Sequence, residues 1–510
     1  MQITGSSLKA EDVFRVAHTP SLKLELSAEA LGQMKKSRDY IEKRIRAGEV
    51  IYGVNTGFGA FSSVRISDSE IEELQRNLIR SHSVGIGTPF TREQTRAMML
   101  LRANALARGH SGIRPVVVEK ILEFLNHNVI PVVPSQGSVG ASGDLAPLSH
   151  IALALSGEGV AWAEAGSVTS VASLLRKHQL RPLELQAKEG LSLINGCQVM
   201  TAVGLLELEK ARRLLKFADI AGALSLEAMR GSRKAFDPLI AMTRAHAGEA
   251  KTAGNLRRLL GETSEIAESH KNCGRVQDAY SLRCMPAVHG AVKDTFHHVL
   301  RVLETEANSS TDNPLVFADD NKILSCGNFH GMPVAFAMDF AGIAFSSLAS
   351  ISECRTAKLI NPALSELPAF LTPQGGLNSG HMIVQVAAAS LVSENKVLAH
   401  PASVDSIPTS AEKEDHVSMG TIAARKFSQI LENATQVISL EFLAASQGLD
   451  LLKPLKPAAG VKAAHECLRA VVPFAEKDRV FSLDQRKVRE LIQKDQLLQA
   501  TEKVTGELHI

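Results

Sequence analysis

Apolar residues recur at helical spacing along most of this 510-residue chain, and strand-like alternation is scarce. The pattern predicts helices over 27–47, 67–80, 91–108, 113–126, 189–229, 291–309, 334–359, 384–398 and 422–446. It predicts a brief strand near 168–171 and an extended lead-in over 1–26. Because several helices have unbroken apolar faces, we expect a bundle whose central helices are covered on all sides, partly by other subunits.

Two capping boxes and two breaks divide this pattern. Ser67 with Glu70, and Thr91 with Gln94, have the spacing that opens a helix. Prolines break the chain at 131–134 and again at 454–457. We expect an N-terminal region over 1–200, a central long-helix bundle over 201–450 and a C-terminal helical region over 451–510, joined as one continuous fold.

Composition narrows the class of protein. Hydrophobic residues make up 45% and charged residues 22% of the chain, with a net charge of +2, so no strong field indicates nucleic acid or a membrane surface. The six cysteines form no close pairs, and no signal layout precedes the first helix. The apolar run 334–351 contains Asp339 and is shorter than the roughly 20 residues of a membrane helix. We therefore expect a cytoplasmic protein without a nucleic-acid or membrane partner. No metal-ligand cluster and no nucleotide-binding glycine motif is found in the sequence, and His297 and His298 are expected on a solvated helix face.

The most informative tract is the glycine-dense stretch 137–150, which precedes an apolar helical run. Ala141, Ser142 and Gly143 at its centre are small, so the backbone can bend sharply there. In a tight bend the Gly143 nitrogen can attack the Ala141 carbonyl carbon. Loss of two water molecules, one of them taking the Ser142 hydroxyl, then leaves a five-membered ring with a methylidene group. The chain would thus build its own electrophile. A nucleophile elbow is excluded because Asp144, not glycine, follows two residues after Ser142.

The tract and at least five other blocks resemble the aromatic amino acid lyases, and the resemblance covers nearly the whole chain. It implies a mainly α fold: an elongated helical bundle with a smaller N-terminal region that carries the reactive loop. It also implies a homotetramer with active sites shared between subunits. The cofactor it implies is 4-methylidene-imidazol-5-one, formed autocatalytically from Ala141, Ser142 and Gly143, with no external cofactor and no metal.

The resemblance places four residues from two sequence blocks at the site, among them the one that deprotonates the substrate and the one that binds its carboxylate. Tyr52, in a glycine-rich loop, matches the tyrosine that removes the β-proton, although a phenol there could also simply stack against the loop. Arg283 matches the residue that binds the substrate carboxylate, since a guanidinium pairs with a carboxylate bidentately. An arginine of this kind is otherwise more often part of a structural ion pair. Tyr280, placed with the catalytic residues, and Gln277 accompany Arg283 in the same block.

Four further residues complete the expected site. Asn195, which on its own would be a turn residue, matches a contact to the substrate carboxylate and the ring. Phe329 is expected near the ring, with a place in the core as the alternative. His82 and Glu414 match the residues that bind an imidazole, whose nitrogens need polar partners when buried. Glu414 distinguishes a histidine-specific site from the others more strongly than His82 does, because relatives that act on phenylalanine or tyrosine usually have an amide at its position.

The resemblance is strongest to the members that act on histidine. It implies elimination of ammonia from L-histidine to give trans-urocanate, the first step of histidine degradation. Two alternatives stay open: a lyase or 2,3-aminomutase that uses the same ring on tyrosine or another amino acid, and a catalytically silent tetrameric paralogue. Five positions depart from the family pattern and bear on substrate preference: Cys197, Ala287, Met332, His381 and Lys413.

Overall fold

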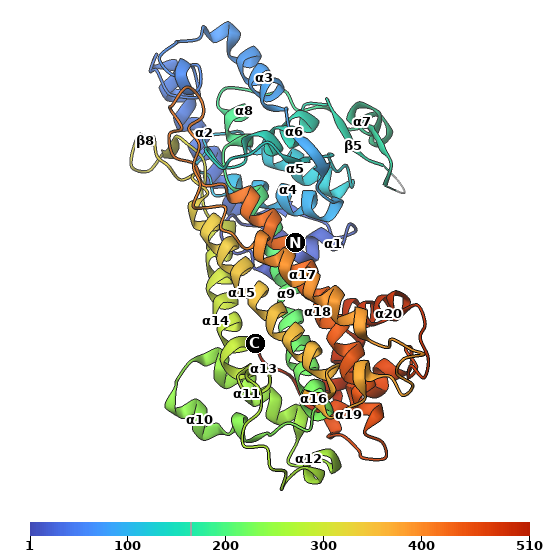
Figure 1. Ribbon diagram of the computed structural model, residues 1–510. Coiled ribbons are helices and arrows are strands. Elements are labelled where there is room, and N and C mark those ends of the chain that lie inside the picture. Colours follow the sequence, from blue (N-terminus) through green and yellow to red (C-terminus); the bar gives the residue numbers. More distant parts are fainter. Residues whose placement is uncertain (164–165) are drawn as a thin grey trace. The chain divides into compact units, whose positions relative to one another are not determined.

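Helices make up most of the protein in the computed structural model, which describes residues 1–163 and 166–510 (Figure 1). This confirms the predicted mainly α class. Among the described residues, strands occur as four short pairs: β1 (Gln2–Ile3) with β2 (Glu25–Leu26), β3 (Ile86–Pro89) with β4 (Pro134–Gln136), β5 (Val160–Trp162) with β6 (Val168–Ser170), and β7 (Leu315–Phe317) with β8 (Lys322–Leu324). The first pair is parallel and the other three are antiparallel, and β6 confirms the strand predicted near 168–171.

The chain divides into two compact units, each assembled from separate stretches of sequence. Unit 1 comprises Met1–Glu209, Val299–Asp339 and Pro401–Ser428, and unit 2 comprises Lys210–His298, Phe340–His400 and Gln429–Ile510. The division into 1–200, 201–450 and 451–510 stays a prediction.

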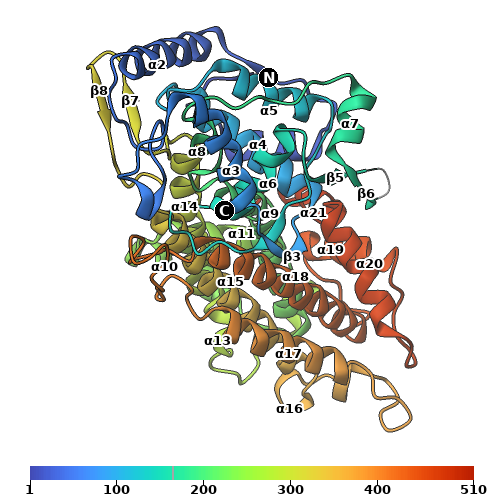
Figure 2. The ribbon, with the colours of Figure 1, turned by 90° about the horizontal axis from the view of Figure 1, so that it is seen from above.

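Unit 1 contains the eight helices that come first in the sequence. They are α1 (Ala10–His18), α2 (Ala28–Arg46), α3 (Ile71–His82), α4 (Arg92–Ala107), α5 (Pro115–Asn126), α6 (Leu145–Leu155), α7 (Val171–His178) and α8 (Glu189–Ile194). Helix α4 is the core of this unit, because every residue from Thr95 to Ala107 is buried. It packs against α1, α2 and α5, while α3, α6 and α8 pack against one another. Figure 2 shows α2 beside the β7–β8 hairpin.

Four long helices contribute residues to both units. They are α9 (Gln198–Ala228), α14 (Met285–Ala307), α15 (Met332–Leu359) and α18 (Gly420–Leu451). Within unit 2 a buried carboxylate on α18 joins three of them: Glu441 accepts hydrogen bonds from Ser225 on α9 and from Ser352 and Arg355 on α15. Such a buried charge needs a full set of partners, and these contacts supply it.

Shorter helices complete unit 2. They are α10 (Pro238–Thr243), α11 (Ala247–Leu260), α12 (Glu265–Ser269), α13 (Tyr280–Arg283), α16 (Pro362–Ser365), α17 (Met382–Leu398), α19 (Ala459–Arg469), α20 (Phe481–Gln493) and α21 (Gln496–Thr505). Helices α19, α20 and α21 are the last three in the sequence, and α21 packs against both of the others.

Three predictions about local structure are wrong. The lead-in over 1–26 contains a helix, α1, because Ala10, Val13 and Val16 recur at helical spacing and are buried. The helix predicted over 189–229 is two helices, since the chain leaves the helical path at 195–197. At the first capping box, Ser67 caps no backbone N–H with its side chain, and a short 3₁₀ turn precedes α3. The second box forms as predicted: Thr91 and Gln94 exchange side chain–backbone hydrogen bonds of 3.2 and 3.0 Å.

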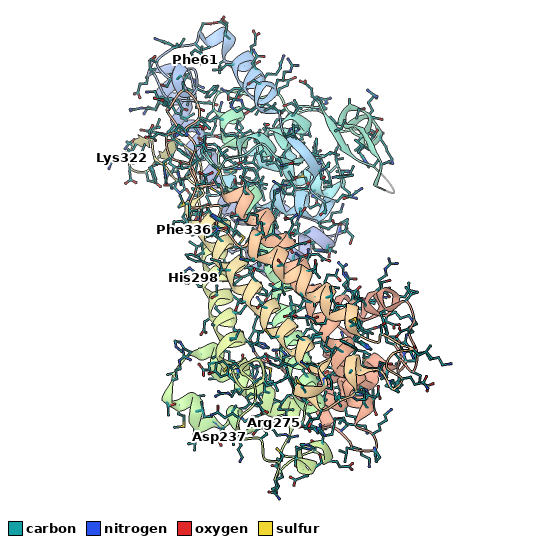
Figure 3. All side chains as sticks on the ribbon, viewed as in Figure 1. Phe61, Asp237, Arg275, His298, Lys322 and Phe336 are labelled. Carbon is teal, nitrogen blue, oxygen red and sulfur yellow. The ribbon has the colours of Figure 1, made fainter. Side chains whose placement is uncertain are left out.

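Helix α15 is the one described helix whose length and composition would allow it to cross a membrane. It spans 28 residues, so the expectation that this stretch is shorter than a membrane helix is wrong. However, 61% of its most apolar stretch is buried inside the protein, as is typical of a core helix. His297 and His298 on α14 are exposed, as predicted; Figure 3 labels His298.

Candidate active site

A cavity of about 800 Å³ lies within unit 1. Three separate parts of the sequence line it, in the ranges 52–82, 142–195 and 313–414. Six of the residues predicted for the site are among its lining residues: Tyr52, His82, Ser142, Asn195, Phe329 and Glu414. A smaller cavity of about 330 Å³ is lined by Ala141 and Gly143, and it shares Ser142, His82 and Glu414 with the first. The loop that carries Ser142 therefore borders both cavities, which share part of their walls.

The loop that carries Ala141, Ser142 and Gly143 is bent as tightly as the sequence predicts. Gly140 and Gly143 have φ values of +72° and +75°, in the left-handed region that favours glycine. A Cβ atom on Gly143 would lie 2.2 Å from the carbonyl oxygen of Gly196, and one on Gly140 would lie 2.1 Å from Oγ of Ser418. No larger residue fits at either position without movement of its surroundings.

The backbone after α8 forms two hydrogen bonds with this loop. The Gly196 N–H donates to the Ser142 carbonyl oxygen at 3.2 Å, and the Asp144 N–H donates to the Gly196 carbonyl oxygen at 2.8 Å. The Ser142 hydroxyl donates to Oε1 of Glu414 at 3.3 Å. A ring made from Ala141, Ser142 and Gly143 needs small residues, a compressed backbone and a hydrogen-bond donor to its one oxygen, which is the Ser142 carbonyl oxygen. The residues present meet these needs and so fit the group that the family resemblance implies.

Asp144 anchors the other end of the loop, a role that the sequence analysis did not assign. Its fully buried carboxylate accepts hydrogen bonds from the N–H groups of Val199 and Met200 at the start of α9, at 2.9 and 3.0 Å. It also accepts from Thr421. Burial raises the pKa of Asp144 to about 6, and these hydrogen bonds oppose that shift. An acidic residue directly after the triplet is the signal in the sequence, but the partners on α9 that define its role lie 55 and 56 residues away.

Asn195 is held by a buried polar cluster. Its Nδ2 donates to Oδ1 of Asp312 at 3.3 Å, and Asp312 also pairs with Lys188 at 2.6 Å. Arg102, from the core helix α4, donates to the Asn195 carbonyl oxygen at 2.8 Å. Both Asp312 and Lys188 are almost completely buried, and burial lowers the pKa of Lys188. The side chain of Asn195 is therefore fixed rather than free to rotate, which suits a residue that contacts a substrate.

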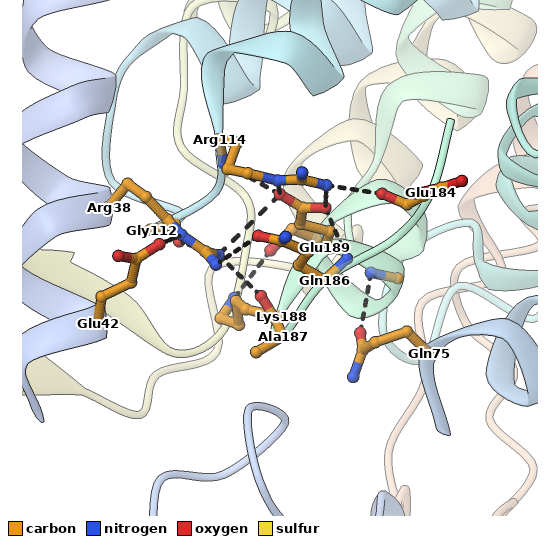
Figure 4. A network of polar contacts seen from close by, with 12 residues as sticks. Arg38, Glu42, Gln75, Gly112, Arg114, Glu184, Gln186, Ala187, Lys188 and Glu189 are labelled. Carbon is orange, nitrogen blue, oxygen red and sulfur yellow. Dashed lines mark hydrogen bonds and ion pairs between the residues drawn. The ribbon is translucent and has the colours of Figure 1, made fainter. Parts of the chain in front are cut away.

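A second network fixes helix α8, which ends one residue before Asn195. Figure 4 shows its centre, where the buried carboxylate of Glu189 forms a bidentate pair with Arg114 at 2.7 Å for both bonds. The backbone N–H of Gln186 donates to the same carboxylate at 2.8 Å. Gln75 of α3 accepts from the Gly190 N–H at 2.9 Å, so α3 and α8 are tied together. These contacts fix the side of the cavity that Asn195 occupies.

Tyr52 lies on the glycine-rich loop before α3 and is half-buried against the cavity. Its hydroxyl oxygen accepts a weak hydrogen bond from the Gly59 N–H at 3.4 Å. Phe61, on the same loop and labelled in Figure 3, also lines the cavity although its side chain is 70% exposed. The phenol thus has an oxygen beside the cavity and one long hydrogen bond among the described residues, as expected for a group that exchanges a proton with a ligand.

His82 ends α3 and presents a hydrogen-bond acceptor. Its Nδ1 lies 2.8 Å from the carbonyl oxygen of Leu78, which can only accept, so Nδ1 carries the proton. Nε2 of the neutral ring is then an acceptor. Burial lowers the pKa of His82, which favours this neutral form; the nearby charge of Glu414 acts in the opposite direction.

Glu414 is held by an unusual turn. Thr409 and Glu414 pair through their backbones, and the Thr409 hydroxyl donates to Oε2 of Glu414 at 2.6 Å. Between them Ser410, Ala411 and Glu412 have φ values of +51°, +53° and +64°. Three successive non-glycine residues in the left-handed region store strain, which is typical of functional loops. Thr409 is a second residue that the sequence analysis missed, since only the folded turn brings it to the carboxylate.

The remaining predicted residues lie in unit 2 and form a cluster of their own at α13. Arg283 donates to Oε1 of Gln277 at 3.0 Å, and its guanidinium carbon lies 4.6 Å from the centre of the Tyr280 ring. Tyr280 is 71% exposed. Arg283 and the two residues predicted beside it are therefore together, and they belong to a different unit from the six that line the cavity.

Phe329 is in contact with Cys197, one of the five positions that depart from the family pattern. The buried Cys197 thiol donates to the Phe329 carbonyl oxygen at 3.0 Å, so this cysteine supports the cavity wall from behind. Lys413, next to Glu414, is exposed.

Comparison with known proteins defines the class. A model of the aromatic amino acid lyase family matches residues 8–470. The match covers most of the chain, so the protein belongs to the aromatic amino acid lyase family and is an enzyme.

Individual relatives narrow the class further. A histidine ammonia-lyase of Sorangium cellulosum is 51% identical over 99% of this chain and 100% of its own length. The crystal structure of histidine ammonia-lyase from Trypanosoma cruzi is similar with a TM-score of 0.92 at 42% identity, over 99% of this chain and 96% of that one. A tyrosine aminomutase from Streptomyces globisporus is similar with a TM-score of 0.94 at 37% identity, over the full length of both chains.

Proposed function

We propose that this enzyme is a histidine ammonia-lyase, which eliminates ammonia from L-histidine to give trans-urocanate and so begins histidine degradation in the cytoplasm. The observation that carries the proposal is that Tyr52, Ser142 and Glu414 line one cavity. The similarity to histidine ammonia-lyases over almost the whole chain supports the same substrate.

The prosthetic group we propose is 4-methylidene-imidazol-5-one, formed from Ala141, Ser142 and Gly143. Once formed, this ring supplies an electrophile that makes the substrate amino nitrogen a better leaving group. The close approach of Gly143 to Gly196 supports ring formation at this position.

The substrate imidazole is bound by His82 and Glu414 in this proposal. A neutral imidazole has one N–H donor and one acceptor nitrogen. Nε2 of His82 and the carboxylate of Glu414 both accept hydrogen bonds, so together they favour a ligand ring that carries protons on its nitrogens. A phenylalanine side chain would leave these groups without partners, at a cost of about 1–3 kcal/mol for each.

Tyr52 is proposed to remove the β-proton. The phenol oxygen accepts one described hydrogen bond, from the Gly59 N–H, and because this bond is long it leaves the oxygen accessible to a proton of the substrate. Asn195 and Phe329 complete the wall beside the reacting carbons.

The substrate carboxylate is assigned to Arg283, with Gln277 and Tyr280 beside it. We propose that a neighbouring subunit of a homotetramer supplies this cluster to each cavity. The exposed apolar residues of unit 2 support such an assembly, because Phe340 and Ile343 on α15 are 45% and 48% exposed and lie one turn apart. Ile383 and Val386 on α17 repeat the pattern.

The test is to incubate the purified protein separately with L-histidine and with L-tyrosine. The proposal predicts trans-urocanate from histidine and slow or no conversion of tyrosine. The similarity to a tyrosine aminomutase makes the alternative specific: coumarate or a β-amino acid from tyrosine, with histidine left unchanged, would replace the proposal.

A further inference from the structure

Arg283, the residue proposed to bind the substrate carboxylate, has one edge of its guanidinium group occupied by its own chain. Nε donates to the Asp278 carbonyl oxygen at 3.1 Å, and Nη2 donates to Oε1 of Gln277 at 3.0 Å. The Tyr280 ring lies against the same group, with its centre 4.6 Å from the guanidinium carbon. The other edge, formed by Nη1 and the second proton of Nη2, has no partner among the described residues. This free edge can take both oxygens of a carboxylate.

We propose that Asp278 is a positioning residue for Arg283: its backbone carbonyl aims the guanidinium group, and its side chain fixes that carbonyl in place. The proposal rests on the proposed function, because it concerns how the same site recognises the substrate carboxylate. Asp278 lies in the sequence block that contains Gln277, Tyr280 and Arg283, but the family resemblance assigns no role to it.

The Asp278 side chain is almost completely shielded from solvent, with 4% of it exposed. Its Oδ2 accepts a hydrogen bond from the Ser232 N–H at 2.6 Å, and its Oδ1 pairs with Arg275 at 3.5 Å. Arg275, labelled in Figure 3, also donates to the Met229 carbonyl oxygen at 3.0 Å. These contacts tie the carboxylate to the segment that directly follows α9. A shielded carboxylate with a short bond to a backbone N–H has little freedom to move.

Gln277 does not constrain Arg283 to the same degree. Gln277 is exposed, so its side chain can exchange this hydrogen bond for water, and ordering that side chain costs rotamer entropy. The Asp278 carbonyl belongs to the backbone and has no rotamers of its own. Asp278 therefore provides the firmer of the two contacts.

Helix α13, which carries Arg283, is held to the core separately. Ser281 and Leu282 are buried, and the buried Arg355 donates to the Ser281 carbonyl oxygen at 3.4 Å. Arg355 is itself fixed by a bidentate pair with Glu441 at 2.5 and 2.8 Å. The backbone of Arg283 is thus fixed by α13, and the direction of its guanidinium group is left for Asp278 to set.

This ordering of Arg283 raises its affinity for a carboxylate. An arginine side chain that is free to rotate loses rotamer entropy when a ligand binds to it. Arg283 has already lost much of that freedom, because Nε is bound to the Asp278 carbonyl before the ligand arrives. Removal of the Asp278 carboxylate should therefore weaken ligands that carry a carboxylate and leave other ligands unaffected.

The experiment measures by calorimetry how two ligands bind to the purified full-length protein: urocanate, which carries a carboxylate, and 4-methylimidazole, which does not. Asp278→Ala is expected to bind urocanate about 10-fold more weakly and to bind 4-methylimidazole like the wild type. Asp278→Asn keeps an oxygen that can accept from the Ser232 N–H, so it should restore most of the affinity for urocanate.

Asp237→Ala is the matched control. The exposed Asp237 carboxylate also accepts a backbone N–H, that of Leu239 at 2.9 Å, and it lies in the same unit. Its loss removes the same kind of hydrogen bond without any contact to Arg283, so both affinities should stay at the wild-type value. If Asp278→Ala does not fold, as judged by circular dichroism, Asp278→Ser replaces it with the same expectations, because the serine oxygen is one bond too short to reach the Ser232 N–H.

Arg283→Lys supplies the second arm of the experiment. Asp278→Ala should cause no further loss of urocanate affinity in the Arg283→Lys background, because both residues act through one guanidinium group. Three results would overturn the inference: unchanged urocanate affinity in a folded Asp278→Ala, equal weakening of both ligands, or an undiminished loss in the Arg283→Lys background.

Failure of the inference is distinguishable from failure of the proposed function. If Arg283→Lys weakens urocanate binding and a folded Asp278→Ala does not, Asp278 has no positioning role and the proposed carboxylate site stands. If Arg283→Lys leaves urocanate binding unchanged, the carboxylate site and the inference are both refuted.

Discussion

Gly143 lies so close to Gly196 that a Cβ atom on Gly143 would be 2.2 Å from the Gly196 carbonyl oxygen. The two residues pair as a parallel β-bridge between the reactive loop and the break after α8. We predict that Gly143→Ala destabilises the protein by about 2 kcal/mol or more beyond the backbone cost of its positive φ.

A matched control separates the cost of the close contact with Gly196 from the backbone cost of a positive φ. Gly48 has a φ of +81° and open space where a Cβ would be, so Gly48→Ala should lose only about 1–2 kcal/mol. Urea unfolding of both variants measures the difference. Equal losses would mean that the contact between Gly143 and Gly196 does not constrain the loop.

Replacing Tyr52 by phenylalanine tests its role as the base. We predict that Tyr52→Phe still forms the ring, since Tyr52 has no contact with Ser142 among the described hydrogen bonds, but turns over histidine about 100- to 10,000-fold more slowly. Tyr40→Phe is the control, because the Tyr40 hydroxyl is buried without a partner in the described structure and its removal should leave activity intact. The assay measures urocanate formation beside the intact mass. Wild-type turnover in Tyr52→Phe would exclude the phenol as the base.

Arg283→Lys tests carboxylate recognition. Lysine keeps the charge but cannot form a bidentate pair, so we predict that kcat/KM falls about 10- to 100-fold. Arg244→Lys, a surface ion-pair residue in the same unit, should change nothing measurable. Unchanged steady-state kinetics in Arg283→Lys would remove Arg283 from the site.

The free energy of unfolding is expected to depend on pH because His82 is partly buried. Burial lowers its pKa below the usual 6.5, so above pH 6.5 the ring is neutral in both the folded and the unfolded chain. As the pH falls below 6.5, the unfolded chain takes up a proton before the folded protein does, and stability is lost. The wild type should therefore lose stability relative to His82→Gln between pH 6.5 and the lowered pKa. Urea unfolding at several pH values tests this, and parallel curves for the two proteins would contradict it.

The sequence alone predicts much of the helical fold and of the cavity, for different reasons. Long apolar stripes predict α14, α15 and α18, which bury wide faces. They also predict α17, although its buried residues are only Val384, Ala388 and Asn395. The break at Asn195 could not be predicted from periodicity, since leucines and alanines continue on both sides of it. Gly196 leaves the helix because it pairs with a loop 53 residues earlier, and such tertiary pairing has no local signal.

For the candidate active site, too, the sequence does not reveal residues whose role depends on tertiary contacts. Tyr52, His82, Asn195 and Glu414 could be predicted as a set because each lies in a motif that resembles the family. Asp312, by contrast, lies in no such motif, and it matters only because Lys188 and Asn195 meet it in the folded core. Residues that orient others are recognised from contacts rather than from their own type.

The central claim is that this chain converts Ala141, Ser142 and Gly143 into an electrophilic ring, and the mass of the purified protein tests it most directly. The account predicts a mass lower than that of the encoded polypeptide by two water molecules for the wild type. Ser142→Ala, which has no hydroxyl to lose, should fold, lack the second dehydration and lose nearly all activity. A folded wild-type protein with the full mass of its sequence would contradict the account.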